Sequence, residues 1–229
     1  MTGDRFKKMR GIYAEAVTLA PALRPRSARL SPQNLESSEE LNRLPVLKKE
    51  WLMELQQLHP PFVGYLSCHS AEIGHIYVSP GPIFEPSLAT DASGHGMDLM
   101  FGAAGIGPGD VVLNTWSYHL VPAGLLFDHG ARAVGATVIP GGTGSSELQA
   151  EIMLKLGVTA YVGSTAFFMT LIERLEATGH ALPQDWRLRH AFIGGELGDW
   201  AAKRRHLEQR YAISTWSLLR HRGLRSHWI

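Results

Sequence analysis

Residues 109–124 read Gly109-Asp-Val-Val-Leu-Asn-Thr-Trp-Ser-Tyr-His-Leu-Val-Pro-Ala-Gly124. The apolar first half is typical of a buried strand, and the chain then breaks into Ser117, Tyr118 and His119 before a helix pattern begins. In open parallel sheets, ligands bind beyond the carboxyl ends of the strands. Ser117, Tyr118 and His119 are therefore the first candidates for a binding site.

The same alternation of strand and helix continues through most of the remaining chain. Helices are expected over residues 97–105, 123–135, 146–156, 165–178 and 200–210, and strands over 111–115, 136–140, 159–163, 190–193 and 212–215. Glycines that tolerate the left-handed helix cap stand at four expected helix ends, namely Gly105, Gly135, Gly157 and Gly179. The alternation predicts an α/β fold, a mostly parallel sheet with helices on both faces.

The region before residue 97 is patterned differently. Pro21, Pro25 and Pro32 interrupt any helix in residues 1–35, which we expect to form an irregular N-terminal arm. Residues 36–96 are expected to form a helical cap followed by a loop-rich segment.

Within that cap, Ser37 and Glu40 have the spacing of a capping box for a short helix, and a second helix is expected over residues 47–58. A short strand at 76–79 then leads into a rigid turn, Ser79-Pro-Gly-Pro82. The α/β domain covers residues 97–215, and residues 216–229 match no helix or strand pattern.

The bulk composition excludes several classes of protein. The 229 residues are 45% hydrophobic, enough for a substantial core. With 22 basic and 21 acidic residues, the net charge of +1 favours neither nucleic acid nor an anionic membrane as a partner. The single cysteine, Cys68, excludes an internal disulfide, and there is no apolar run of about 18 residues, so we expect a cytoplasmic protein.

Three further patterns favour structural roles. The segment Gly141-Gly-Thr-Gly144 invites a dinucleotide interpretation, but the motif would end in Glu147, so a tight turn capped by Ser145 or Ser146 is favoured. Cys68 and His69 are adjacent on an extended chain and point to opposite faces, which favours a solvated loop cysteine. The eleven histidines show no metal-ligand spacing, and we predict no metal site.

Seven short stretches between Leu41 and Thr215 form a series. In chain order they are Leu44-Pro-Val-Leu-Lys-Lys, His59-Pro-Pro-Phe-Val-Gly64, Val78-Ser-Pro-Gly-Pro-Ile-Phe-Glu-Pro86, Asn114-Thr-Trp-Ser-Tyr-His-Leu-Val-Pro-Ala-Gly124, Gly135-Ala-Thr-Val-Ile-Pro-Gly-Gly-Thr-Gly144, Tyr161-Val-Gly-Ser-Thr165 and Gly194-Gly-Glu196. Taken together, the series resembles the N-terminal part of the phenylacetate-CoA ligase group of AMP-forming adenylating enzymes.

The resemblance implies a reaction and a set of ligands. Such enzymes join a carboxylic acid to ATP to form an acyl-adenylate, and they then pass the acyl group to coenzyme A. ATP, Mg²⁺ and coenzyme A are thus the implied cofactors, and the implied partner is a small-molecule carboxylic acid. The resemblance also implies that Tyr118 and His119, with Ser117 beside them, border the acyl pocket. The implied nucleotide-binding residues are Gly194, Gly195 and Glu196.

The chain departs from the family pattern in two places. Ser79-Pro-Gly-Pro82 stands where the family has a phosphate-gripping loop rich in Ser, Thr and Gly and followed by Lys, a replacement that one branch of the family shares. After Thr215 the family continues with a Tyr-Gly-Thr-Ala/Glu segment, whereas residues 216–229 carry no acid. Because a shift of one nucleotide from Leu219 onward permits Tyr-Gly-Thr-Ala-Asp, we interpret residues 216–229 as an out-of-frame tail.

Two functional hypotheses remain open. The first is a truncated phenylacetate-CoA ligase-like protein that is inactive alone, because groups that position the phosphates and the thiol are missing. The alternative is a non-catalytic module, derived from the same fold, that binds a ligand or pairs with a partner chain. The basic tail resembles a nucleic-acid contact in composition, but an out-of-frame peptide explains it as simply. An unfinished sheet edge at residues 212–215 is expected to favour self-association.

Overall fold

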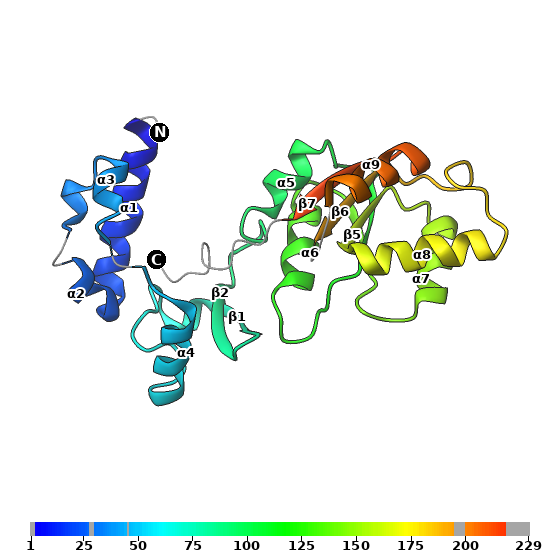
Figure 1. Cartoon of the computed structure of the whole chain (residues 1–229). Helices are drawn as coiled ribbons and strands as arrows, with labels where there is room; N and C mark the ends of the chain where they lie inside the picture. The colour runs from blue at the N-terminus through cyan, green and yellow to red at the C-terminus, as the bar shows by residue number, and fades with distance from the viewer. Residues whose placement is uncertain (1–2, 28–29, 45, 195–199, 219–229) are drawn as a thin grey trace. The chain divides into compact units, whose positions relative to one another are not determined.

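The computed structural model describes residues 3–27, 30–44, 46–194 and 200–218 (Figure 1). The chain divides into two compact units, the first of which runs to Asp91 while the second begins at Ala92. A search of the described residues finds no helix with the length and apolar character needed to span a membrane.

The second unit is built around a five-stranded sheet with the strand order β4-β3-β5-β6-β7, in which every neighbouring pair is parallel. The strands are β3 (Val111–Asn114), β4 (Thr137–Pro140), β5 (Ala160–Ser164), β6 (His190–Gly194) and β7 (Ser214–Leu218). The helices are α5 (Met97–Ala103), α6 (Ala123–Ala133), α7 (Ser146–Lys155), α8 (Thr165–Ala177) and α9 (Trp200–Tyr211). The predicted α/β fold with a parallel sheet is confirmed.

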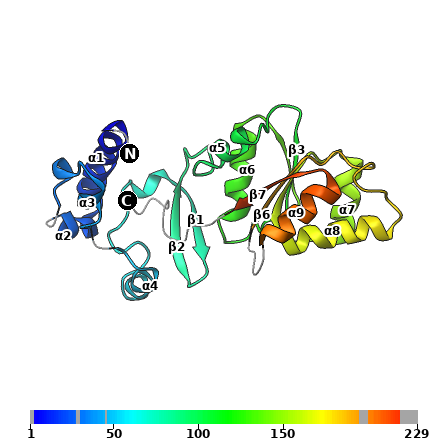
Figure 2. The ribbon, with the colours of Figure 1, turned by 45° about the horizontal axis from the view of Figure 1, so that its top comes forward.

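The two faces of this sheet bury different side chains against different helices. Leu113 and Tyr161 belong to a core cluster that includes side chains of α7, α8 and α9. Val112 and Val162, their neighbours along the same strands, belong to a cluster with side chains of α5 and α6. Because successive strand residues point to opposite faces, the two clusters lie on opposite sides of the sheet. Figure 2 shows α8 and α9 on one side and α6 on the other, so helices cover both faces as predicted.

Strands β3 and β4 are parallel neighbours, but the loops that follow them run to opposite faces of the sheet. Strand β3 is followed by α6, whereas β4 is followed by α7 on the other face of the sheet. Because the two loops run to opposite faces of the sheet, they can enclose a space at its carboxyl edge, the edge at which open parallel sheets bind ligands. The topology therefore predicts that the loops after β3 and β4 border a crevice.

Strand β7 forms one edge of the sheet and extends beyond the predicted strand. Residues 216–218 of the predicted tail pair with β6, with Trp216 opposite Phe192. The two rings stack with their centroids 5.9 Å apart. For residues 216–218 the expectation of no secondary structure is therefore wrong. Pairing with β6 and the contact between the two rings hold these residues in the sheet, and no local sequence pattern indicates either. The rest of the predicted out-of-frame tail, residues 219–229, lies outside the described residues.

The first unit combines helices with an antiparallel hairpin (Figure 1). Its elements are α1 (Gly3–Leu19), the 3-10 helix η1 (Pro21–Leu23), α2 (Arg24–Ser27), the 3-10 helix η2 (Pro32–Asn34), α3 (Ser38–Leu41), α4 (Lys49–Leu58), the 3-10 helix η3 (Ser70–Glu72), β1 (Ile73–Ser79) and β2 (Ile83–Leu88). Ala16 of α1, Leu52 of α4 and Ile83 of β2 pack together in its core.

The expectation of an irregular arm over residues 1–35 is wrong for most of that segment. Helix α1 spans Gly3–Leu19, and all three prolines follow it in the chain. Pro21 lies in the first turn of η1, where a missing N–H leaves no hydrogen bond unmade. The prolines therefore limit where α1 can end, but they do not prevent a helix before them.

The predicted capping box is present in the first unit. The Glu40 N–H donates to Ser37 Oγ at 3.2 Å, and the Ser37 N–H donates to Glu40 Oε2 at 3.1 Å. Strand β2 was not predicted, since it contains Pro86, which cannot donate to the strand ladder. Buried Gln56 of α4 supports this strand, because its side-chain amide bonds both the N–H (2.9 Å) and the carbonyl (3.0 Å) of Phe84.

Candidate functional site

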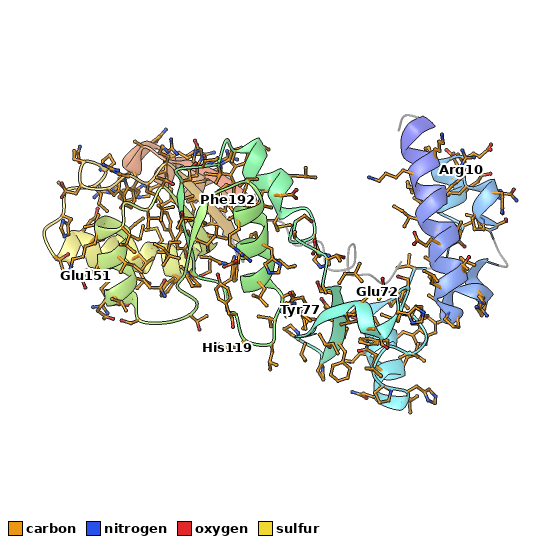
Figure 3. All side chains as sticks on the ribbon, turned by 180° about the vertical axis from the view of Figure 1, so that it is seen from behind. Arg10, Glu72, Tyr77, His119, Glu151 and Phe192 are labelled. Carbon is orange, nitrogen blue, oxygen red and sulfur yellow. The ribbon has the colours of Figure 1, made fainter. Side chains whose placement is uncertain are left out.

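The loop between β3 and α6, residues 115–122, holds Ser117, Tyr118 and His119. The exposed His119 precedes a tight turn, in which the Val121 N–H donates to the His119 carbonyl at 2.6 Å. Leu120, at the centre of this turn, has a φ of +59°, a left-handed conformation that costs a residue with a side chain about 1 kcal/mol. Figure 3 shows His119 on this loop. Backbone strain of this kind is frequent at binding sites.

Ser117 shapes the loop from within. Its Oγ accepts a hydrogen bond from the His119 N–H at 3.1 Å, and its carbonyl accepts one from the Gly124 N–H at 3.0 Å. A Cβ at residue 124 would lie 2.4 Å from the Ser117 carbonyl oxygen and 2.9 Å from Tyr118 Cγ. Glycine at this first turn of α6 therefore allows the loop to pack directly against the helix.

A cavity of about 470 Å³ lies between this loop and the loop after β4. It is lined by Tyr118, His119, Pro140, Gly141, Gly142, Thr143 and Gly144. Its volume falls within the range of small-molecule pockets, and none of its lining residues is Lys, Arg, Asp or Glu. The cavity therefore suits a small ligand with an apolar body, and it stands where the divergence of β3 and β4 predicts a crevice.

The loop after β4 supplies the second wall, which the sequence indicated only as a turn. The Gly142 N–H donates to the Asn114 carbonyl at 3.0 Å, and Gly142 has a φ of +60°, which glycine adopts without steric cost. Gln149 Nε2 donates to the carbonyls of Gly141 and Gly142, each at 3.1 Å. Helix α7 begins after Ser145, which is one of the two predicted caps. Both ends of the loop are thus bound to neighbouring elements.

The hydroxyl of Tyr118 makes hydrogen bonds to two side chains of the protein. Asn114 Nδ2 donates to it at 2.9 Å, and the hydroxyl donates to Asp128 Oδ2 at 3.2 Å. Arg132 Nε in turn donates to Asp128 Oδ1 at 2.6 Å. Burial, followed by the charge of Asp128 and its hydrogen bond, raises the pKa of Tyr118 above its ordinary value. The phenol therefore stays protonated, and its O–H donates a hydrogen bond to Asp128.

Sequence reasoning missed Asn114, Asp128 and Arg132. Two signals were available: Asn114 is a polar residue at the end of an apolar strand, and Asp128 and Arg132 have the i,i+4 spacing of a helical ion pair. Neither signal identifies Tyr118 as the shared partner, because that contact depends on how α6 packs against the loop.

The predicted nucleotide-binding residues are only partly described. Gly194 ends β6, is buried, and pairs with Ser164 of β5. Since β5 separates β6 from β3, Gly194 does not line the cavity at Tyr118. Gly195 and Glu196 lie outside the described residues.

The Ser79-Pro-Gly-Pro82 turn connects β1 to β2 in the first unit. Ser79 is 3% exposed, and its hydroxyl donates to Glu85. Pro80 and Pro82 have no N–H, and Lys49 Nζ donates to the Pro80 carbonyl at 2.5 Å. The turn therefore lacks the run of free backbone donors with which loops bind phosphate.

The described residues form no metal site built from protein side chains alone. They contain no cluster of three or more His, Cys, Asp or Glu side chains that could hold a metal ion. The cavity at Tyr118 has no carboxylate in its lining, whereas carboxylate oxygens are the usual protein ligands of Mg²⁺.

A larger hollow of about 520 Å³ occurs in the first unit, lined by His59, Pro60, Pro61, Phe62, Val63, Gly64 and Leu66. All of its walls come from one short segment after α4, and it gathers no polar side chains from separate elements. The smaller cavity at Tyr118 is the better candidate, because its walls come from two loops, after β3 and after β4, that are separate in the sequence.

Comparison with known proteins finds relatives that share one name, although no protein-family model matches the chain. The phenylacetate-coenzyme A ligase of Thermus thermophilus is 26% identical over 199 residues, which is 84% of this chain and 43% of that protein. The ligase of the same name from Pseudomonas putida is 25% identical and covers 92% of this chain and 48% of its own. The chain is thus similar to phenylacetate-CoA ligases. It spans about half the length of these curated relatives and fits an N-terminal portion of them.

Solved structures show a similar likeness. The chain matches 2-hydroxyisobutyryl-CoA ligase in complex with R3-HIB-AMP with a TM-score of 0.82 and 25% identity, over 93% of this chain and 48% of that one. An open conformation of that ligase, in complex with 2-HIB-AMP and CoA, has a TM-score of 0.83 and 24% identity over the same shares. The predicted adenylating-enzyme fold is confirmed.

Proposed function

We propose that this chain carries the acid-binding part of an AMP-forming carboxylate-CoA ligase. In the proposed reaction, a carboxylate oxygen attacks the α-phosphorus of ATP, and pyrophosphate leaves, which gives an acyl-adenylate. The thiol of coenzyme A then attacks the acyl carbon, AMP leaves, and a thioester forms. The observation that carries the proposal is the cavity beside Tyr118, at the strand divergence of a sheet that matches a CoA ligase. In this proposal Tyr118 and His119 bind the acyl group.

The contribution of these residues is to bind and orient the acid. The Tyr118 ring and Pro140 offer apolar surface to an acyl chain or aryl ring, while His119 and Thr143 are polar side chains in the lining. Holding the carboxylate in one orientation accelerates its attack, because the entropy of bringing the reactants together is lost before the reaction. ATP supplies the adenylyl group and coenzyme A the thiol.

The nucleotide is proposed to lie beyond β6, at Gly194, Gly195 and Glu196. Gly194 has no side chain at the carboxyl end of a buried strand, so a ligand could approach the backbone closely there.

Calorimetry with phenylacetate and the 229-residue chain tests the proposal. We expect binding to wild type, and we expect Tyr118→Ala to weaken it about tenfold, because the ring forms one wall of the cavity. At about tenfold excess over the Kd, the ligand should stabilise the wild type by about 1.4 kcal/mol, which is visible as a thermal shift. Glu151→Gln, on the exposed side of α7, is the control and should bind like wild type. Equal binding by wild type and Tyr118→Ala would show that phenylacetate does not bind in the cavity beside Tyr118.

An activity assay separates the ligase from the module hypothesis. We expect the 229-residue chain to bind the acid but to form no acyl-CoA from ATP and CoA, because the Ser79-Pro-Gly-Pro82 turn lacks the run of free backbone donors with which loops bind phosphate. The hypothesis of a non-catalytic binding module stays open, because every residue that lines the cavity belongs to this chain and lies between Tyr118 and Gly144. A downstream reading frame that continues the ligase would favour a broken gene, whereas an intact partner gene would favour the module.

A further inference from the structure

We propose that Asp128 is a positioning residue of the candidate acyl pocket: it holds the Tyr118 hydroxyl on the protein side, so that the ring forms a fixed wall of the cavity. The ligand of the pocket rests on the proposed function. The contact between Asp128 and Tyr118 does not, since it is a feature of the fold.

Asn114 decides the direction of the hydrogen bonds. This residue is fully buried, and its Nδ2 donates to two acceptors, the Tyr118 hydroxyl at 2.9 Å and the Gly124 carbonyl at 2.8 Å. Its Oδ1 accepts the Trp116 N–H at 3.2 Å. Because both amide hydrogens are already used, the Tyr118 hydroxyl is an acceptor towards Asn114 and must direct its own hydrogen elsewhere.

Asp128 is the acceptor for that hydrogen. It lies on α6, its side chain is 16% exposed, and its Oδ2 is 3.2 Å from the Tyr118 hydroxyl. Arg132, one turn later on α6, binds the other carboxylate oxygen at 2.6 Å and thereby orients the group. The chain of contacts joins the end of β3, the site loop and α6.

This arrangement determines what the cavity presents to a ligand. With its hydroxyl committed to Asn114 and Asp128, Tyr118 offers its ring as an apolar surface. A ring held in one orientation loses less conformational entropy when a ligand packs against it, so the order imposed by Asp128 contributes to affinity. Loss of Asp128 should weaken acid binding without removing any atom from the cavity lining, because Asp128 does not line it.

Asp128→Asn tests the proposal in the full chain, with Asp128→Ala as a second variant. Tyrosine labelled with ¹³C at Cζ reports the phenol by NMR, and Tyr118→Phe identifies the signal. Because the phenol then loses its hydrogen bond to a charged acceptor, we expect the Tyr118 ¹³Cζ signal of Asp128→Asn to move from its wild-type position at neutral pH. We also expect the Kd for phenylacetate to rise about tenfold, the scale of a lost hydrogen bond to a charged group.

The matched control is Glu151→Gln, which removes another i,i+4 ion pair, with Lys155 on α7, away from the cavity. It should leave both the Tyr118 ¹³Cζ signal and the Kd unchanged. If the Tyr118 signal has the same position in wild type and Asp128→Asn, the positioning role is overturned. If wild type binds no phenylacetate but the signal moves, the contact is supported and the proposed function fails instead. An unchanged Kd together with a moved signal overturns the contribution to affinity.

Discussion

Gly163 in β5, at the carboxyl edge of the sheet, has no room for a side chain. Beside it, Thr115 Oγ1 donates to the Tyr161 hydroxyl at 3.0 Å, and this hydroxyl donates to the Ser164 carbonyl at 3.0 Å. A Cβ on residue 163 would lie 1.9 Å from Thr115 Oγ1 and 2.3 Å from the Tyr161 hydroxyl oxygen. A larger residue would therefore separate polar groups that are buried together.

We expect Gly163→Ala to lower the free energy of unfolding by about 2–4 kcal/mol, because it combines overpacking with the loss of buried hydrogen bonds. Gly102 in α5 is the matched control, since a Cβ there meets nothing within 4 Å. Gly102→Ala should stabilise the chain by about 0.5–1 kcal/mol through helix propensity. Urea denaturation measures both changes. An equal effect of the two substitutions would show that the contacts at Gly163 do not matter.

Among the strands, three are tied together at the amino edge of the sheet by Asp110. This residue precedes β3, and it accepts hydrogen bonds from Thr159 Oγ1 at 2.7 Å, from the Gly107 N–H at 3.0 Å and from Arg189. Burial alone would raise the pKa of Asp110, but the bonds from Thr159 and Gly107 and the charge of Arg189 together hold it below its ordinary 3.8.

A lowered pKa in the folded state has a definite effect on acid stability. The stabilisation by Asp110 is complete above pH 3.8 and is lost as the pH falls further, through the pKa of the folded protein. We expect Asp110→Asn to lower the free energy of unfolding by about 1–3 kcal/mol at pH 7. The difference from wild type should shrink below pH 3.8, as measured by urea denaturation across pH. A constant difference at every pH would contradict the role of the carboxylate.

The secondary structure of the α/β region could be read from the sequence, but that of the first unit only in part. Strand β3 and helix α6 were predicted to within two residues, because apolar runs and helix-ending glycines are local signals. Strand β2 was missed because Pro86 contradicts its local pattern. The contact between Tyr118 and Asp128 was missed for another reason: it joins a loop to a helix face, and no periodicity encodes that approach.

At the scale of the molecule, β7 is the edge of the sheet. No strand in the described part of the chain pairs with its outer side. The Ser214 N–H donates to the Arg189 carbonyl at 2.8 Å, so strand alternation directs the N–H of Ser217 outwards. The predicted self-association through this edge stays a prediction.

We expect the wild-type chain to associate as its concentration rises, and we expect Ser217→Lys to reduce this, because a lysine on an edge strand disfavours pairing with a second edge. Sedimentation velocity over a concentration series measures the association. Exposed Ser217 makes no buried contact, so the thermal midpoint should change little. A wild-type chain that stays monomeric throughout the series would show that this edge is not an association surface.

Local order in this protein follows from its amino acids: strands from apolar runs, helix ends from glycines, and a parallel sheet from their alternation. The series of motifs was sufficient to indicate the ligase resemblance. The cavity and the orientation of Tyr118 depend instead on folding in three dimensions. Neighbouring strands must diverge before two loops can face each other, and α6 must pack against the loop before Asp128 can accept the Tyr118 hydrogen bond. Such contacts depend on distances between segments, which local sequence patterns do not specify.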